Sequence, residues 1–136
     1  MTPKEWLAKH YPVPASEATG SELEAARHSL RKWEGLTSKA RGSLLVSGLR
    51  LLVSYDSSSE VIRFNVRTCA LCQRHLDGCE RCVLYQIRDG VTCFREDDEG
   101  RNPYESLKYH GDPLPMIRLL RKAVKELKRE EGKAEE

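Results

Sequence analysis

Two stretches of the chain carry apolar residues at the 3.6-residue period of an amphipathic helix, and each opens with a capping signal. The first begins at Ser21, which forms a capping box with Glu24, and ends near Gly35. The second begins at Asp112, a good N-cap, followed by Pro113 at the first helical position. The sequence therefore predicts two main helices. Their apolar stripes are Leu23, Ala26, Leu30 and Trp33, flanked by Arg27, His28, Arg31 and Lys32, and then Ile117, Leu120, Val124 and Leu127.

Between residues 42 and 68 the period changes from 3.6 to 2, which is typical of strands. The alternation runs over residues 49–55 and again over 62–66, with the polar loop 56–60 between them. This pattern predicts an antiparallel hairpin with one face in water, and it places Arg50, Arg63 and Arg67 on that face. The second strand would lead directly into Cys69.

A further hairpin is predicted over residues 83–94, because Asp89-Gly90 between apolar residues is a strong turn signal. With these two residues as the turn, Cys93 lies roughly 13 Å along the ribbon from Cys82. Such a hairpin makes Cys93 a poor partner for Cys82. If residues 83–88 instead form a short helix, Cys93 returns towards the other cysteines.

Together these elements predict one small α+β domain, an antiparallel sheet with two main helices, over residues 1–131. Residues 1–20 are expected to form an N-terminal arm, anchored by Trp6 and Tyr11, and residues 132–136 a frayed tail. Only 39% of the residues are hydrophobic and 32% are charged, so the core is modest. Small domains with thin cores usually need a staple.

Five cysteines within residues 69–93 can supply that staple. Four of them form two Cys-x-x-Cys hooks, and each hook offers two thiolates from one tight turn. The sequence therefore predicts a structural Zn²⁺ in a cysteine knuckle, held by Cys69, Cys72, Cys79 and Cys82, with Cys93 as the substitute ligand. An iron–sulfur cluster is less favoured, because the run of closely spaced cysteines found in ferredoxins is missing. A redox dithiol is less favoured too, because one hook would suffice for it.

A zinc ion with four thiolate ligands has no open position for water, which favours a structural role over a catalytic one. His75 lies between the hooks and could replace a cysteine, but we expect it to face solvent in a loop. His10, His28 and His110 have no carboxylate or serine at a diagnostic spacing. Because the sequence has no phosphate-binding glycine loop and no nucleophile motif, it predicts a protein that is not an enzyme.

Charge leaves nucleic-acid binding open as an alternative function. The net charge is only +2, but residues 39–95 hold nine Lys and Arg against five Asp and Glu. Arginines on the sheet and around the hooks could follow a phosphate backbone. This candidate face consists of Arg50, Arg63, Arg67, Arg74, Arg81 and Arg88.

The chain has no recognisable secretory signal, and its longest apolar stretch, residues 43–55, is too short and too polar to span a bilayer. We therefore expect a cytoplasmic protein. In that reducing compartment, paired thiols hold metal more often than they form disulfides.

The order of these landmarks resembles a group of small cysteine-rich proteins encoded by bacteriophages and prophages, mostly of unknown function. The resemblance covers roughly residues 22–107. It implies a phage accessory protein in the cytoplasm of a bacterial host, where such proteins commonly bind host complexes of transcription or defence. We therefore expect a non-catalytic module whose partner is a host or phage protein. The matching landmarks are residues 29–34 around Trp33, the hooks 69–72 and 79–82, Cys93, and Asn102-Pro103-Tyr104.

Overall fold

A computed structural model of the chain describes residues 2–42, 44–55, 58–65, 68–93, 95–100 and 102–134. These residues form α-helices and one three-stranded antiparallel sheet, which confirms the predicted α+β class. In chain order the elements are α1 (Pro3–His10), the 3-10 helix η1 (Ala15–Glu17), α2 (Glu22–Glu34), α3 (Ser38–Arg41), β1 (Leu45–Ser47), β2 (Arg50–Tyr55), β3 (Ser58–Arg63), α4 (Ala70–Arg74), the 3-10 helix η3 (Cys79–Arg81), α5 (Val83–Ile87), α6 (Pro103–His110) and α7 (Leu114–Ala134).

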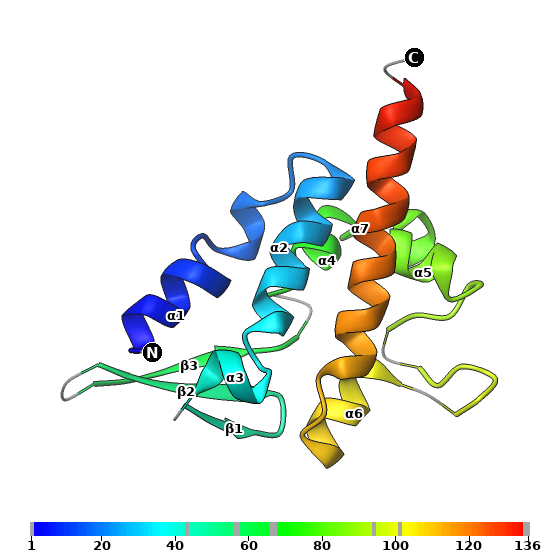
Figure 1. Cartoon of the computed structure of the whole chain (residues 1–136). Coiled ribbons are helices and arrows are strands. Elements are labelled where there is room, and N and C mark those ends of the chain that lie inside the picture. The colour runs from blue at the N-terminus through cyan, green and yellow to red at the C-terminus, as the bar shows by residue number, and fades with distance from the viewer. Residues whose placement is uncertain are drawn as a thin grey trace.

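Of the two main helices, α2 begins where its capping residue predicts, and α7 begins at Leu114, one residue later than predicted. Ser21 Oγ accepts a hydrogen bond from the amide of Glu24 at 3.0 Å, and Asp112 Oδ1 accepts one from the amide of Leu114 at 3.0 Å. Figure 1 shows α2 and α7 side by side, with α5 against the other side of α7. The stripe residues Leu23, Ala26 and Trp33 of α2 and Ile117, Leu120 and Val124 of α7 are all buried.

The sheet confirms the predicted hairpin and adds a strand to it. β2 pairs with β3 and also with β1, so the strand order is β1-β2-β3. The pairing sets Arg50 opposite Arg63, and both are exposed on one face, as predicted, whereas Val66 and Arg67 lie outside the described residues. β3 already begins at Ser58, so the loop predicted over 56–60 is too long. The hydrogen bonds that pair two strands come from backbone groups only. Polar residues can therefore extend the pairing beyond the apolar residues that pack against the core.

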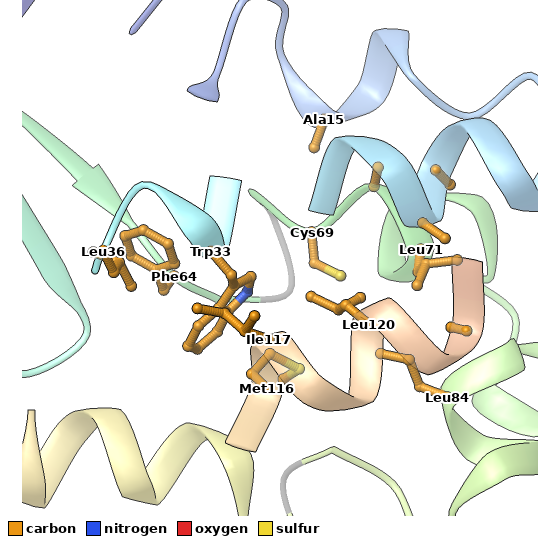
Figure 2. Packing of buried hydrophobic residues seen from close by; sticks show 14 of the residues in the cluster. Ala15, Trp33, Leu36, Phe64, Cys69, Leu71, Leu84, Met116, Ile117 and Leu120 are labelled. Carbon is orange, nitrogen blue, oxygen red and sulfur yellow. The ribbon is translucent and has the colours of Figure 1, made fainter. Parts of the chain in front are cut away.

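Aromatic rings join the sheet to the helices at the centre of the core. The Trp33 ring meets the Phe64 ring edge-on at 5.1 Å between centroids and the Tyr104 ring at 5.5 Å. Tyr104 belongs to α6, a helix that the sequence pattern did not reveal. Figure 2 shows this packing continuing past Ile117 to Cys69 and Leu120, so a cysteine of the first hook lies within the apolar core.

The segment predicted as an N-terminal arm is tied into the core. Trp6 of α1 is fully buried, and its indole Nε1 donates a hydrogen bond to the carbonyl of Gly35 at 2.9 Å. A Cβ added at Gly35 would lie 2.5 Å from the Trp6 ring, so this close approach requires glycine. Within the described ranges, no helix has both the length and the apolar composition needed to cross a membrane.

The hairpin predicted over residues 83–94 is wrong, because α5 occupies Val83–Ile87. This helix ends in a Schellman motif: the Gly90 amide donates to the Tyr85 carbonyl at 2.9 Å, and the Asp89 amide donates to the Gln86 carbonyl at 3.2 Å. Asp89 and Gly90 both have positive φ, 54° and 87°. A two-residue hairpin turn requires positive φ at both positions as well, so Asp-Gly suits either structure.

Candidate metal centre

The first hook is built at the start of α4, which Cys69 caps. The sulfur of Cys69 accepts a hydrogen bond from the thiol of Cys72. The bond from the Cys72 thiol is the main reason that the pKa of Cys69 lies well below its usual range, and burial opposes this shift. The pKa of Cys72 is raised, because its thiol donates that bond and is itself largely buried. Of this pair, Cys69 is therefore the thiol prepared to be the anion.

Further donors approach Cys69 from other elements. The hydroxyl of Ser29, a buried residue of α2, lies 3.7 Å from Cys69 Sγ. The side chain of Tyr104, in α6, is also hydrogen-bonded to Cys69. Because hydrogen bonds to the charged form of a group favour that form, these contacts stabilise a thiolate inside the core.

A buried lysine stands beside this hook. Lys32 is only 2% exposed, and its ammonium donates hydrogen bonds to the carbonyls of Arg63 at 2.5 Å and Thr68 at 3.1 Å. The ammonium also lies over the Phe64 ring, 4.3 Å from its centroid. Burial lowers the pKa of Lys32 to about 7, against the opposite influence of Cys69 and its neighbour Cys72. Negative charge on the hook therefore favours the protonated lysine.

The second hook, like the first, lies at the start of a short helix, but one of its cysteines is buried and the other is exposed. Cys82 is the N-cap residue of α5, and the backbone amides of Leu84 and Tyr85 lie near its sulfur without forming a capping hydrogen bond. Burial raises the pKa of Cys82 to about 11, and those amides act in the opposite direction. Cys79, at the start of η3, is exposed. Of the two cysteines in this hook, only Cys82 belongs to the core.

Cys93 is half-buried and packs against the core, because α5 ends and the chain turns back. Burial raises the pKa of Cys93, and so do the charges of Cys69 and Cys82, while Arg88 acts in the opposite direction. The guanidinium of Arg88 donates to the carbonyls of Thr92 and Arg95, on either side of this cysteine. The turn after α5 therefore holds Cys93 among the thiols from which the predicted hairpin would have removed it.

One carboxylate ties both hooks to α2. Glu22 Oε1 accepts from Arg74 Nε at 3.0 Å and lies 2.6 Å from His75 Nε2, and Glu22 Oε2 accepts from the amide of Val83 at 2.8 Å. The side chain of His75 is only 13% exposed, so the expectation that it faces solvent is wrong. Its Nε2 is engaged by Glu22 and does not point freely towards the cysteines. Arg74 and His75 follow the first hook, and Val83 follows the second.

The donor set fits a thiolate-bound metal, but the described side chains do not form a finished coordination shell. Among the residues that the structure describes, no three His, Cys, Asp or Glu side chains are arranged so as to hold an ion as they stand. The chemistry of the cluster suits Zn²⁺, since its ligands are soft and polar side chains, those of Ser29 and Tyr104, already approach Cys69. The predicted zinc knuckle therefore remains a proposal.

The arginines predicted to follow nucleic acid have different surroundings. Arg50 and Arg63 are exposed and opposite one another on β2 and β3. Arg74 is bound to Glu22, and Arg88 holds the loop around Cys93. Arg81 is exposed on η3, and Arg67 lies outside the described residues. Among the described members of the set, the sheet pair is therefore the clearest candidate for binding an external anion.

The polar residues around Cys69 were not identified from the sequence as part of the site. Lys32 and His28 were placed beside the apolar stripe of α2, yet both are buried. The signal was present in the helical period, because Ala25, Ser29 and Lys32 recur at i, i+4 and i+7. Tyr104 appeared only as a landmark near a proline.

Comparison of this chain with models of protein families, with curated proteins and with solved structures found no match. The resemblance to phage proteins therefore stays a prediction. Any function has to be argued from the residues and their arrangement.

Proposed function

We propose that this chain is a small, non-catalytic protein-binding module whose fold is completed by a structural zinc ion held by cysteine thiolates. The observation that carries the proposal is the surroundings of Cys69. Cys69, in an apolar core, is hydrogen-bonded to Ser29 and Tyr104 and interacts electrostatically with the ammonium of Lys32. Polar groups that converge on a buried sulfur stabilise a thiolate, and a cation bound to that thiolate accounts for its position in the core.

Redox chemistry is the weaker alternative for the same cysteines. Cys69 has the lowered pKa expected of an attacking thiol, but only 8% of the residue is exposed. Thiol–disulfide exchange requires another sulfur to approach in line with the attacked bond, so a buried thiol is poorly placed for it. An iron–sulfur cluster would use the same ligands, and its colour distinguishes it from zinc.

Elemental analysis of the purified protein, with melting curves recorded before and after treatment with a strong chelator, tests the metal proposal. We expect about one zinc per chain and loss of the cooperative transition on removal, because structural zinc supplies much of the folding free energy of small domains. Restored Zn²⁺ should recover the transition, whereas Mg²⁺, the matched control, should not. Cooperative folding of a metal-free chain would contradict the proposal, and bound iron with visible absorbance would favour the cluster.

The outer face of the sheet supports binding of a protein. Leu45 of β1 is 65% exposed and Val61 of β3 is 38% exposed, and both pair in register with Leu52 of β2. In the adjacent row, Arg50 faces Arg63. Like charges directly opposite one another destabilise a sheet, and an acidic partner would relieve that cost. An apolar row beside a basic pair suits a protein surface with carboxylates at its rim, and the phage resemblance places that partner in a bacterial host.

The same arginine pair favours nucleic acid as the second candidate function. A labelled generic duplex, titrated at 50 and 200 mM salt, separates the two, because phosphate contacts weaken steeply with salt. We expect negligible duplex binding. For a protein partner recovered from host lysate, Leu45→Asp should abolish binding, whereas Leu76→Asp, at a similarly exposed leucine in the turn after α4, should not. Salt-dependent duplex binding that is lost in Arg63→Gln would contradict a protein-binding role for this face.

A further inference from the structure

We propose that the fourth metal ligand is Cys93 and not Cys79. This inference rests on the proposed zinc site and names its ligands. The metal is then held by Cys69, Cys72, Cys82 and Cys93, and Cys79 is a free thiol at the surface.

Burial separates the five cysteines in this way. Cys69 and Cys82 are part of the hydrophobic core, and Cys72 and Cys93 pack against it. Cys79 belongs to neither group and is exposed. A closed thiolate site is shielded from water on most sides, so four ligands at the edge of the core suit it better than three with one in solvent.

Electrostatic interactions also separate Cys79 from the other four cysteines. The charge of Cys69 raises the pKa of Cys72, Cys82 and Cys93, and the charges of Cys93 and Cys82 raise the pKa of Cys72 as well. Cys79 is among the main influences on Cys93 but not on the other three. These four thiols therefore lie within electrostatic reach of one another, although no three of the described side chains converge closely enough to hold an ion as they stand.

The chain after α5 is built to return Cys93 to this region. The Schellman motif at Asp89 and Gly90 ends the helix and reverses the chain direction. Arg88 then fixes the returning loop by donating to the carbonyls of Thr92 and Arg95. A loop held on both sides of one cysteine positions that cysteine at little further cost in conformational entropy.

Cys79 lies on the outside of that loop. It lines an open cleft of about 440 Å³ together with Glu80, Tyr85, Gly90, Thr92 and Arg95. Thr92 is a neighbour of Cys93, so the loop that brings Cys93 inwards also forms a wall of the cleft beside Cys79. In this arrangement the second hook contributes one ligand, and the loop contributes the other.

The test compares the matched variants Cys79→Ser and Cys93→Ser in the full chain. We expect Cys79→Ser to retain about one zinc per chain and the wild-type melting transition. Cys93→Ser should lose most of the zinc. The reverse result, with zinc lost from Cys79→Ser and kept by Cys93→Ser, would overturn the ligand assignment while leaving the zinc site itself intact.

A measurement on the wild-type protein does not depend on whether a variant folds. The zinc-loaded native protein is treated briefly with iodoacetamide, and the modified cysteines are identified by mass spectrometry. Cys79 alone should react, because zinc-bound thiolates are protected and the other four sulfurs are ligands. Modification of Cys93 with protection of Cys79 would overturn the inference. A wild-type protein that folds without zinc would overturn the proposed function, and the ligand assignment with it.

Discussion

At the scale of the residue, Cys69 shows how a sulfur becomes a prepared ligand. Its hydrogen bonds come from three elements: Cys72 in α4, Ser29 in α2 and Tyr104 in α6. None of these donors needs to move far for the thiolate to form, because Ser29 and Tyr104 are buried and Cys72 packs against the core. Preorganised donors of this kind raise metal affinity by orienting the ligand and stabilising its charge.

The first prediction concerns the contribution of Lys32 to zinc affinity. A zinc ion with four thiolates carries a net charge of −2, and the buried ammonium of Lys32 interacts electrostatically with both cysteines of the first hook. Lys32→Met keeps the apolar stem but removes the charge, so zinc affinity should fall by about 10-fold or more in a chelator competition. Arg31→Met, at an exposed position on the same helix, is the control and should leave the affinity unchanged. Equal affinities in the two variants would show that Lys32 serves only to satisfy backbone carbonyls.

The identity of these residues was only partly predictable from the sequence. The cysteines could be found, because spacing alone marks them. Ser29 and Lys32 carry only a weak local signal, their helical spacing from Ala25, and a polar residue on a helix is usually solvated. Burial of Lys32 depends on Phe64 and Thr68, which are more than thirty positions away along the chain.

At the scale of the element, Glu22 holds together parts that are too short to stand alone. α4 and α5 have five residues each, well below the length at which an isolated helix is stable in water. Glu22, in the first turn of α2, bonds to Arg74 and His75 after one hook and to the amide of Val83 after the other. The long helix therefore sets where both hooks lie.

Replacement of this carboxylate gives the second prediction. Glu22→Gln keeps the shape but removes the charge from three hydrogen bonds, and hydrogen bonds to charged groups contribute about 1.5–3 kcal/mol each. The free energy of unfolding in urea should fall by at least about 1.5 kcal/mol, with weaker zinc retention. Glu24→Gln, exposed in the same helical turn, should change neither. A Glu22→Gln protein as stable as the control would mean that the hooks are positioned independently of α2.

Elements with a regular spacing of apolar residues and a capping residue were predictable from the sequence. Elements that depend on tertiary contacts were not. α2 and α7 follow from their stripes and from Ser21 and Asp112. β1 has three residues and exists only because β2 offers it an edge. The segment 83–94 failed for a different reason: Asp89-Gly90 satisfies two turn geometries equally, and the packing of α5 against α7 selects one of them.

At the scale of the whole molecule, the α+β class followed from the two periods, but the arrangement of the layers did not. The sheet lies towards one end of α2, whereas α4 and α5 lie along the pair of long helices (Figure 1). The thiols are therefore contributed by segments that meet only when α2, α7 and the loop before α6 have packed. Sequence spacing favoured ligands that are close along the chain, and this preference is what placed Cys79 ahead of Cys93.

The shared position of Cys69 links the supply of metal to the amount of working protein. Its sulfur is at once a member of the apolar core and the best-prepared of the candidate ligands, so core packing and metal capture involve the same atom. A chain synthesised without zinc would lack the folding free energy that the metal supplies, and its larger unfolded fraction would be open to proteases. On the proposed site, cellular zinc would then set the abundance of this protein after translation, without any dedicated regulator.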